Sequence, residues 1–238
     1  MKVEVLPDAE SAARAAAMLV ASEARAAVSA RGCCSIAVSG GHTPWLMMRA
    51  LTTETIPWES LRVFQVDERI APAGDPDRNL THLRTSLLEH SPLQAHQIFP
   101  MPVESADLKT AATRYEATLR EIAGSPPVLD LIHLGLGPDG HTASLVPWDP
   151  VLEVTDSDVA LTGVYQGRRR MTLTYPVLNR ARSILWLVTG EEKAGMLVHV
   201  VQGDRSIPAG RVSQNQAIVI ADRPAAVQLA PHDIISHA

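Results

Sequence analysis

Apolar and polar positions follow two different periods along the chain, and the change of period marks the predicted elements. Short apolar runs, or runs that alternate with period two, predict strands, whereas Ala- and Leu-rich runs with a period of about 3.6 predict helices. We expect strands at 3–6, 35–38, 62–66, from 129, 158–164, 171–174, 183–188 and 217–220. We expect helices at 11–29, 44–51, 80–88, 106–123 and 191–200. Such alternation is typical of an α/β fold with a mainly parallel sheet.

The connections between these elements carry start and stop signals. Thr43 and Pro44 suit the N-cap and the first position of the helix expected at 44–51. A Gly-Ser-Pro-Pro turn ends the helix expected at 106–123. Because no internal repeat, low-complexity tract or long linker divides the chain, we expect one domain over residues 1–238. The predicted fold is Rossmann-like, with helices flanking the sheet.

Composition constrains the size of the core and the class of partner. The 238 residues include 46% hydrophobic and 20% charged residues, which is enough for a large core. The formal net charge is -5 and the pI is about 6.0, so no global basic field attracts nucleic acid. An anionic ligand must therefore be met by local positive charge. Lysine is rare, so Lys193 in a glycine-flanked segment is a candidate, with a solvated lysine as the alternative.

Cysteine usage and the N-terminal segment bear on location. Cys33 and Cys34 are adjacent, which suits neither a zinc knuckle nor a disulfide framework and favours a reducing compartment. The N-terminal segment lacks the basic region, apolar run and cleavage site of a secretory signal. No run reaches the roughly 18 apolar residues of a membrane helix. We expect a cytoplasmic protein without a membrane partner.

Four segments that carry reactive side chains follow predicted strands. They are 39–43, 67–69, 135–144 and 190–193. In an open parallel sheet, ligands bind outside the carboxyl ends of the strands. We therefore expect these segments to meet in one active site.

The segment SGGHTP at 39–44 has the features of a phosphate site. Two glycines before a helix start leave backbone N–H groups unpaired at the positive end of the helix dipole. Glycine also lets an anion approach the backbone closely, although a simple tight turn is the alternative. Lys193, Arg69 and the arginine run at 168–170 are available as charged partners, which favours the phosphate interpretation.

The segment GLGPDGHTAS at 135–144 places a titratable imidazole at a strand end. It matches G-x-G-x-x-G, but Pro147 cuts off the long helix that a dinucleotide-binding motif should open. His141 is therefore a candidate general acid/base, and Asp139 a candidate to orient its ring. The alternative is that Asp139 merely ties His141 into its own turn. His133, on the strand, is expected to be a core histidine.

The segment Asp67-Glu68-Arg69 places two acids and a guanidinium after an apolar strand. Arg69 offers a planar set of donors for phosphate or an oxyanion, and one of the acids would keep it oriented. An ordinary charged strand end is the alternative.

Five motifs in one order resemble a known family. They are SGGHTP, VDER, LGLGPDGHTASLVP, RRMTLTYPVLNRAR and LVTGEEKAGML. Together they are similar to the 6-phosphogluconolactonases, whose fold is shared with the glucosamine-6-phosphate deaminases. The resemblance extends over residues 3–221, and DGHTASLVP is its most specific part. It implies hydrolysis of a phosphosugar lactone in the oxidative pentose phosphate pathway without a metal or organic cofactor. We expect a monomer or a weak homo-oligomer.

The resemblance also implies two groups of site residues, one for phosphate and one for catalysis. The phosphate group comprises Gly40, Gly41, Thr43, Lys193 and Arg170. The catalytic group comprises His141 as general acid/base and Asp67 and Asp139 as supporting carboxylates, whereas Arg69, which would face the substrate, is counted with the binding residues. His141 would take a proton from the water that attacks the lactone carbonyl, and amides or an arginine would stabilise the tetrahedral oxyanion.

Three positions bear on related activities. The deaminases usually carry a glutamate five positions after the histidine and an aromatic residue after the Asp-Glu pair, where this chain has Val146 and Arg69. Both differences disfavour isomerisation. Arg78 stands where the lactonases usually have a small serine, which leaves open whether it adds positive charge at the mouth of the site. A sugar-phosphate sensor is a further alternative, but the helix expected at 11–29 leaves no room for a helix-turn-helix module.

Overall fold

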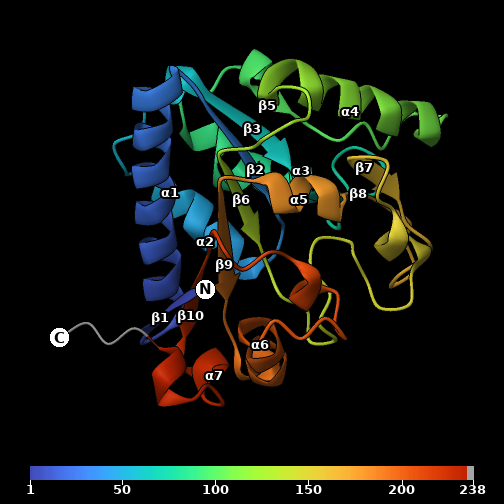
Figure 1. Cartoon of the computed structure of the whole chain (residues 1–238). Coiled ribbons are helices and arrows are strands. Elements are labelled where there is room, and N and C mark those ends of the chain that lie inside the picture. The colour runs from blue at the N-terminus through green and yellow to red at the C-terminus, as the bar shows by residue number, and fades with distance from the viewer. Residues whose placement is uncertain (235–238) are drawn as a thin grey trace.

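A parallel sheet of seven strands forms the centre of the computed structural model, which describes residues 1–234 (Figure 1). The strand order is β1-β10-β9-β6-β2-β3-β5, and every neighbouring pair is parallel. The strands are β1 (Lys2–Leu6), β2 (Cys34–Val38), β3 (Leu61–Gln65), β5 (Ile98–Phe99), β6 (Leu131–Leu134), β9 (Ser183–Val188) and β10 (Ala217–Asp222). The predicted α/β fold with a mainly parallel sheet flanked by helices is confirmed.

A second, antiparallel sheet lies beside the first and was not predicted. Its order is β4-β8-β7, with β4 (Asp67–Arg69), β8 (Arg170–Leu173) and β7 (Val159–Leu161). The sequence pattern treated 67–69 as the polar end of the preceding strand, but these residues pair with β8. The register sets Arg69 directly opposite Arg170. Two guanidiniums from distant parts of the sequence thus start from neighbouring backbone positions.

Seven α-helices complete the fold. They are α1 (Ala9–Arg31), α2 (His42–Leu51), α3 (Asn79–Ser86), α4 (Leu108–Ala123), α5 (Tyr175–Arg180), α6 (Ala194–Val201) and α7 (Arg223–Ala226) within residues 1–234. The short helices α5 and α7 were not predicted, and the helix expected at 191–200 is a 3₁₀ turn followed by α6. None of the helices in residues 1–234 is long and apolar enough to span a membrane.

Helix α1 is longer than its pattern indicated because both of its ends are capped. The Asp8 carboxylate accepts from the Ser11 N–H at 2.7 Å, so the helix begins at Ala9. At the other end Gly32 takes a left-handed conformation with φ of 77°, which glycine adopts without steric cost. Its N–H donates to the Val28 carbonyl and closes the last turn.

The central strands are buried on both faces, as is usual for a parallel sheet covered by helices. Along β9, Ile184, Trp186 and Val188 pack into one core cluster with residues of α4, α5 and α6. The alternate residues Leu185 and Leu187 pack into the other cluster, with α1 and α2. Figure 1 shows α1 and α4 far apart across the sheet. This packing fixes the strand ends from which the site is built.

Candidate active site

Two adjoining cavities lie at the carboxyl ends of β2, β3, β6 and β9. The smaller cavity has a volume of about 110 Å³ and is lined by His141, Arg69 and Arg170 among others. The larger cavity has a volume of about 450 Å³ and is lined by the start of α2 and by Lys193. Both cavities are lined by Gly40, Gly135 and Leu136, so they share a wall. All four predicted segments, including 67–69 in β4, therefore meet at one edge of the sheet, as the sequence indicated.

The turn after β6 sets His141 against Asp139. The Gly137 N–H donates to the His141 carbonyl at 2.8 Å and folds the chain back on itself. His141 Nδ1 lies 2.5 Å from Asp139 Oδ1. A proton on Nδ1 satisfies the carboxylate and leaves Nε2 as the hydrogen-bond acceptor of the ring. Gly137 makes room for this pair, because a Cβ there would lie 2.0 Å from His141 Nδ1.

Hydrogen bonds keep the Asp139 carboxyl ionised. Partial burial works to raise its pKa, but hydrogen bonds from His141 and Tyr165 and the charge of the imidazole lower the pKa more, to below the ordinary 3.8. Tyr165 Oη donates to Asp139 Oδ2 at 2.8 Å. The carboxylate is thus held from two sides while it orients the imidazole.

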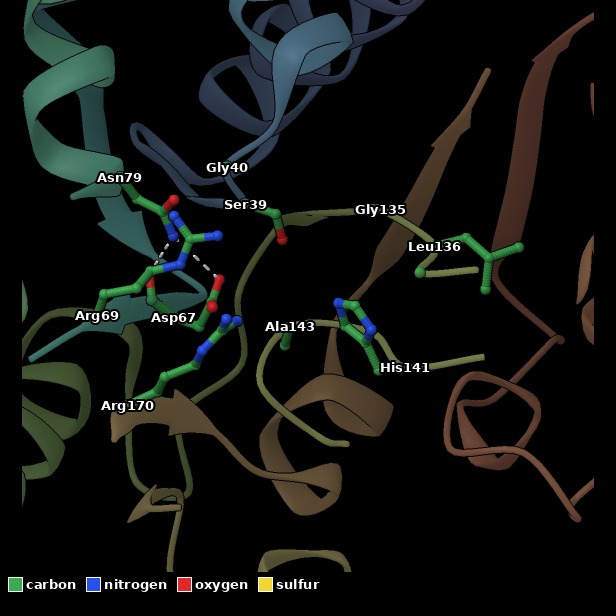
Figure 2. Close-up of a pocket in the computed structure, with 11 residues that line it drawn as sticks. Ser39, Gly40, Asp67, Arg69, Asn79, Gly135, Leu136, His141, Ala143 and Arg170 are labelled. Atoms are coloured by element: carbon green, nitrogen blue, oxygen red, sulfur yellow. Dashed lines mark hydrogen bonds between the residues drawn. The ribbon is translucent and has the colours of Figure 1, made fainter. Parts of the chain in front are cut away.

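Arg69 and Arg170 face His141 across the smaller cavity (Figure 2). Arg69 Nη1 donates to the Asp77 carbonyl at 2.5 Å, and Arg170 Nη2 donates to Gln166 Oε1 at 3.3 Å. Their Nε atoms are buried without a hydrogen-bond partner, and neither forms an ion pair with a carboxylate among residues 1–234. Burial lowers the pKa of Arg170, and the neighbouring Arg69 acts in the same direction while Asp67 opposes it. The two groups stay charged and have donors to spare.

Asp67 is buried behind these arginines and held by neutral donors. Ser144 Oγ donates to Asp67 Oδ2 at 2.6 Å, and Asn79 Nδ2 donates to the Asp67 carbonyl at 2.9 Å. Asn79 Oδ1 is buried and unpaired, and a Cβ on Gly40 would lie 1.9 Å from it. Glycine at this position therefore allows the turn after β2 to pack against Asn79.

Glu68 and Arg78 form a buried pair that supports the same loop. Glu68 is 0% exposed, and its Oε1 accepts from the N–H groups of Arg69 and Asn79, each at 2.8 Å. Arg78 is 2% exposed; its Nε lies 3.2 Å from Glu68 Oε2, and its Nη1 donates to Glu104 at 2.7 Å. Arg78 thus adds no charge at the mouth of the site. It holds the chain that carries Asn79.

The larger cavity is formed where α2 begins. Gly41, not Thr43, is the N-cap, and the helix starts at His42 with no side chain capping it. The Thr43 expectation was wrong because its hydroxyl bonds instead to Thr189 Oγ1 at 2.5 Å. The free N–H groups of the first turn remain available to an anion. Lys193 lines the same cavity, with Nζ 3.8 Å from Glu192 Oε1.

His133 is confirmed as a core residue. It is 0% exposed, and burial lowers its pKa to about 3. Its neutral Nδ1 accepts from the Ser39 N–H at 3.3 Å, and its carbonyl accepts from Ser39 Oγ at 3.0 Å. This histidine thereby ties β6 to the glycine turn that both cavities share.

The predicted site residues fall into two groups, and both arginines of the predicted binding set lie with His141 and not with Lys193. His141, Asp67, Arg69 and Gly40 line the smaller cavity, with Asp139 behind His141. Gly40, Gly41, Thr43 and Lys193 line the larger one. Arg170 is not brought to Lys193 but lies with Arg69. The sequence reasoning missed Asn79 and Tyr165, whose positions depend on the small sheet. The one local signal for Tyr165 was the Gln-Gly pair that follows it, because such a pair suits a tight hairpin turn.

Comparison with known proteins identifies a family and relatives that cover most of the chain. Residues 7–220 match the family described as glucosamine-6-phosphate isomerases/6-phosphogluconolactonase. A 6-phosphogluconolactonase of Synechocystis sp. is 37% identical, with 97% of this chain and 99% of the relative covered. One from Mycobacterium tuberculosis is 36% identical, with 95% and 98% covered.

Solved structures give the same result for the fold. A 6-phosphogluconolactonase from Trypanosoma brucei superposes with a TM-score of 0.85 and 26% identity, covering 96% of this chain and 98% of that one. A monomeric glucosamine-6-phosphate deaminase superposes with a TM-score of 0.83 over 96% of this chain and 100% of the other, and at 19% identity it shows the shared fold alone. The chain therefore belongs to the family of glucosamine-6-phosphate isomerases and 6-phosphogluconolactonases.

Proposed function

We propose that this protein hydrolyses 6-phosphogluconolactone to 6-phosphogluconate, a step of the oxidative pentose phosphate pathway, with His141 as the general base. One observation carries the proposal: a His-Asp pair faces two guanidiniums that lack carboxylate partners, across a cavity of about 110 Å³. Full-length similarity to several 6-phosphogluconolactonases supports the same substrate.

The base side of the reaction follows from the His141–Asp139 contact. Asp139 accepts from Nδ1, so Nε2 takes a proton from a water molecule as that water attacks the lactone carbonyl. The imidazolium then forms beside an ionised carboxylate, which stabilises it. When the ring carbon–oxygen bond breaks, the same Nε2 proton passes to the departing ring oxygen. His141 ends the cycle neutral, and one water has been added across the ester bond.

The arginine side meets the charge that develops on the carbonyl oxygen. Water attack turns that oxygen into an oxyanion, and preorganised donors stabilise it more than they stabilise the neutral lactone. Arg69 and Arg170 are the donors we assign to it, because both line the cavity and neither forms an ion pair with a carboxylate of residues 1–234. Asp67 sits buried among neutral donors behind them and balances part of their charge. This reading gives Arg170 an oxyanion role in place of the phosphate role first expected.

The larger cavity is the place we assign to the phosphate. The unpaired N–H groups of Gly41, His42 and Thr43 lie at the positive end of α2, and Lys193 adds a full positive charge. The shared wall at Gly40 and Gly135 lets one sugar phosphate reach both cavities. Isomerisation is disfavoured, because Val146 is buried and apolar where the deaminases usually supply a glutamate beside the histidine.

The decisive experiment compares lactone hydrolysis by the wild type and His141→Ala. Freshly generated lactone is followed at neutral pH by coupling the acid product to a dehydrogenase, with spontaneous hydrolysis subtracted. We expect kcat to fall by about 10²- to 10⁴-fold. The matched control is His199→Ala, which removes a histidine that also pairs with an aspartate, Asp204 at 2.7 Å, but lies outside both cavities. No acceleration by the wild type would overturn the proposed function.

A further inference from the structure

The hairpin between β7 and β8 brings one aromatic side chain, Tyr165, against the His141–Asp139 pair and Arg170. The Tyr165 N–H donates to the Arg168 carbonyl at 2.9 Å, and the Tyr165 carbonyl accepts from the Arg168 N–H at 3.2 Å. The two residues between them, Gln166 and Gly167, have φ of 49° and 78°, the left-handed pair that a two-residue hairpin turn requires. The turn is therefore tight, and its backbone conformation fixes the position of Tyr165.

The tip of this hairpin is also tied to the loop that follows β4. Arg168 Nε donates to Asp77 Oδ2 at 2.8 Å, and Arg168 Nη2 donates to Asp75 Oδ2 at 3.1 Å. Asp77 offers its carbonyl to Arg69 as well. The hairpin, the β4 loop and the cavity arginines thus form one connected unit.

Tyr165 touches both halves of the proposed machinery. Its Oη donates to Asp139 Oδ2 at 2.8 Å, on the oxygen that His141 does not use. Its ring meets the His141 ring edge to face, with centroids 5.3 Å apart. The Arg170 guanidinium lies over the same ring, 5.0 Å from its centroid. Tyr165 therefore contacts a cation with its ring and donates a hydrogen bond from its hydroxyl.

We propose that Tyr165 is a positioning residue that sets the basicity of His141 through Asp139 and holds Arg170 over the cavity. The proposal rests on the function proposed above and adds a residue to it. The phenol withdraws part of the Asp139 negative charge from the imidazole, so removing the hydroxyl should strengthen the hold of the carboxylate on a protonated ring. The ring, independently, keeps the guanidinium aimed at the reacting carbonyl.

The phenol can do this at every pH at which the enzyme works. Burial, then the hydrogen bond to Asp139, raises the pKa of Tyr165 to about 12, so the hydroxyl stays a donor. The charged groups around the contact are Asp139 and His141 from the turn after β6, and Arg170 from β8, with Arg69 of β4 beside Arg170. The lowered pKa of Asp139 keeps its carboxylate ionised near neutral pH.

Two substitutions separate the hydroxyl from the ring. Tyr165→Phe keeps the platform under Arg170 and removes the donor to Asp139. We expect the imidazole titration of His141, followed by NMR, and the acid limb of kcat/KM to move up together by about half a pH unit. Tyr165→Leu removes both the hydroxyl and the aromatic ring. It should lower kcat about 5- to 10-fold below that of Tyr165→Phe, because the cation–π contact with Arg170 is lost. Tyr175→Phe is the control, because Tyr175 also loses one hydrogen bond, to the Pro208 carbonyl at 2.8 Å.

The design keeps this proposal distinct from the proposed function. The NMR titration needs no substrate, so it decides the Tyr165 role even if the wild type fails to hydrolyse the lactone. Placing Tyr165→Phe in an Asp139→Asn background should abolish the shift, as expected if the hydroxyl acts through that carboxylate. Circular dichroism verifies that each variant is folded. An unchanged His141 titration in Tyr165→Phe, or an equal shift in Tyr175→Phe, would overturn the proposal.

Discussion

A methyl group added at Gly137 tests whether the position of His141 controls the reaction. The backbone of Gly137 lines the smaller cavity, and the residue contributes no side chain to it. An alanine Cβ there would lie 2.0 Å from His141 Nδ1, 2.2 Å from its Cε1 and 2.7 Å from Asp139 Oδ1. All three atoms belong to the proposed base pair, so Gly137→Ala perturbs that pair without removing either member.

The size of the effect follows from these distances. Ordinary van der Waals contact begins at 3.4 Å, so the imidazole must retreat by about 1.4 Å or the turn must open by as much. A displacement of about 1 Å at a reacting group lowers the rate by about 10²-fold. We therefore expect kcat to fall about 10²-fold. Because the larger cavity and Lys193 are untouched, KM should stay close to the wild-type value, and unfolding should be easier by only about 1–2 kcal/mol.

The assay is steady-state lactone hydrolysis combined with urea unfolding of the same samples. Gly195→Ala is the matched control, since a Cβ in α6 meets nothing closer than Gln228 Oε1 at 3.8 Å. It should retain wild-type kcat. Wild-type kcat in folded Gly137→Ala would refute the reasoning, because the base would then tolerate a displacement that general base catalysis does not allow.

Two further predictions address the phosphate site and the buried histidine. Lys193→Ala should raise KM for the phosphorylated lactone by roughly 10- to 100-fold and leave hydrolysis of an unphosphorylated lactone unchanged. The control is Lys109→Ala, which lies on the exposed face of α4. Equal losses of Lys193→Ala activity on both substrates would contradict the assignment. His133 resists protonation when folded, because its pKa is about 3 against an ordinary 6.5, so its contribution to stability is full above pH 6.5 and is lost as the pH falls. Between pH 7 and 5 the free energy of unfolding should fall by about 2 kcal/mol more in the wild type than in His133→Asn, measured with urea; identical falls would refute the buried-neutral assignment.

The elements that the sequence predicted well are those whose pattern depends on burial alone. The strand expected at 183–188 has the same bounds as β9. All six of its side chains are buried, and short apolar runs of that kind are typical of buried strands in a parallel sheet. Helix α4 matched within two residues for the same reason of periodicity. Strands β7 and β8 overlap the strands expected at 158–164 and 171–174, but the separate antiparallel sheet was missed because β4 is three residues long and pairs with β8 across about a hundred positions of sequence.

The candidate site divides in the same way. His141, Asp139 and Arg69 could be named from sequence because reactive side chains at the ends of parallel strands have few structural uses. Asn79 and Tyr165 could not, because Asn79 starts α3 after the loop that follows β4, and Tyr165 is placed by the β7–β8 hairpin, whose antiparallel pairing was not predicted. Arg170 was expected beside the phosphate as part of a basic run, and only the register opposite Arg69 brings it to His141.

The chain has a net charge of -5, so the smaller cavity is positive only where its arginines are not neutralised by carboxylates. Arg78 is paired with Glu68 and Glu104, and Arg168 with two aspartates of the β4 loop. Arg69 and Arg170, which face the cavity, form no such pair among the residues described. Local potential depends on unpaired charge in a partly desolvated space more than on the sum over the chain. The oxyanion role proposed for Arg69 and Arg170 is compatible with an acidic protein because Arg78 and Arg168 take up neighbouring carboxylates in ion pairs, and Asp67 alone is the buried carboxylate that lines the cavity beside them within residues 1–234.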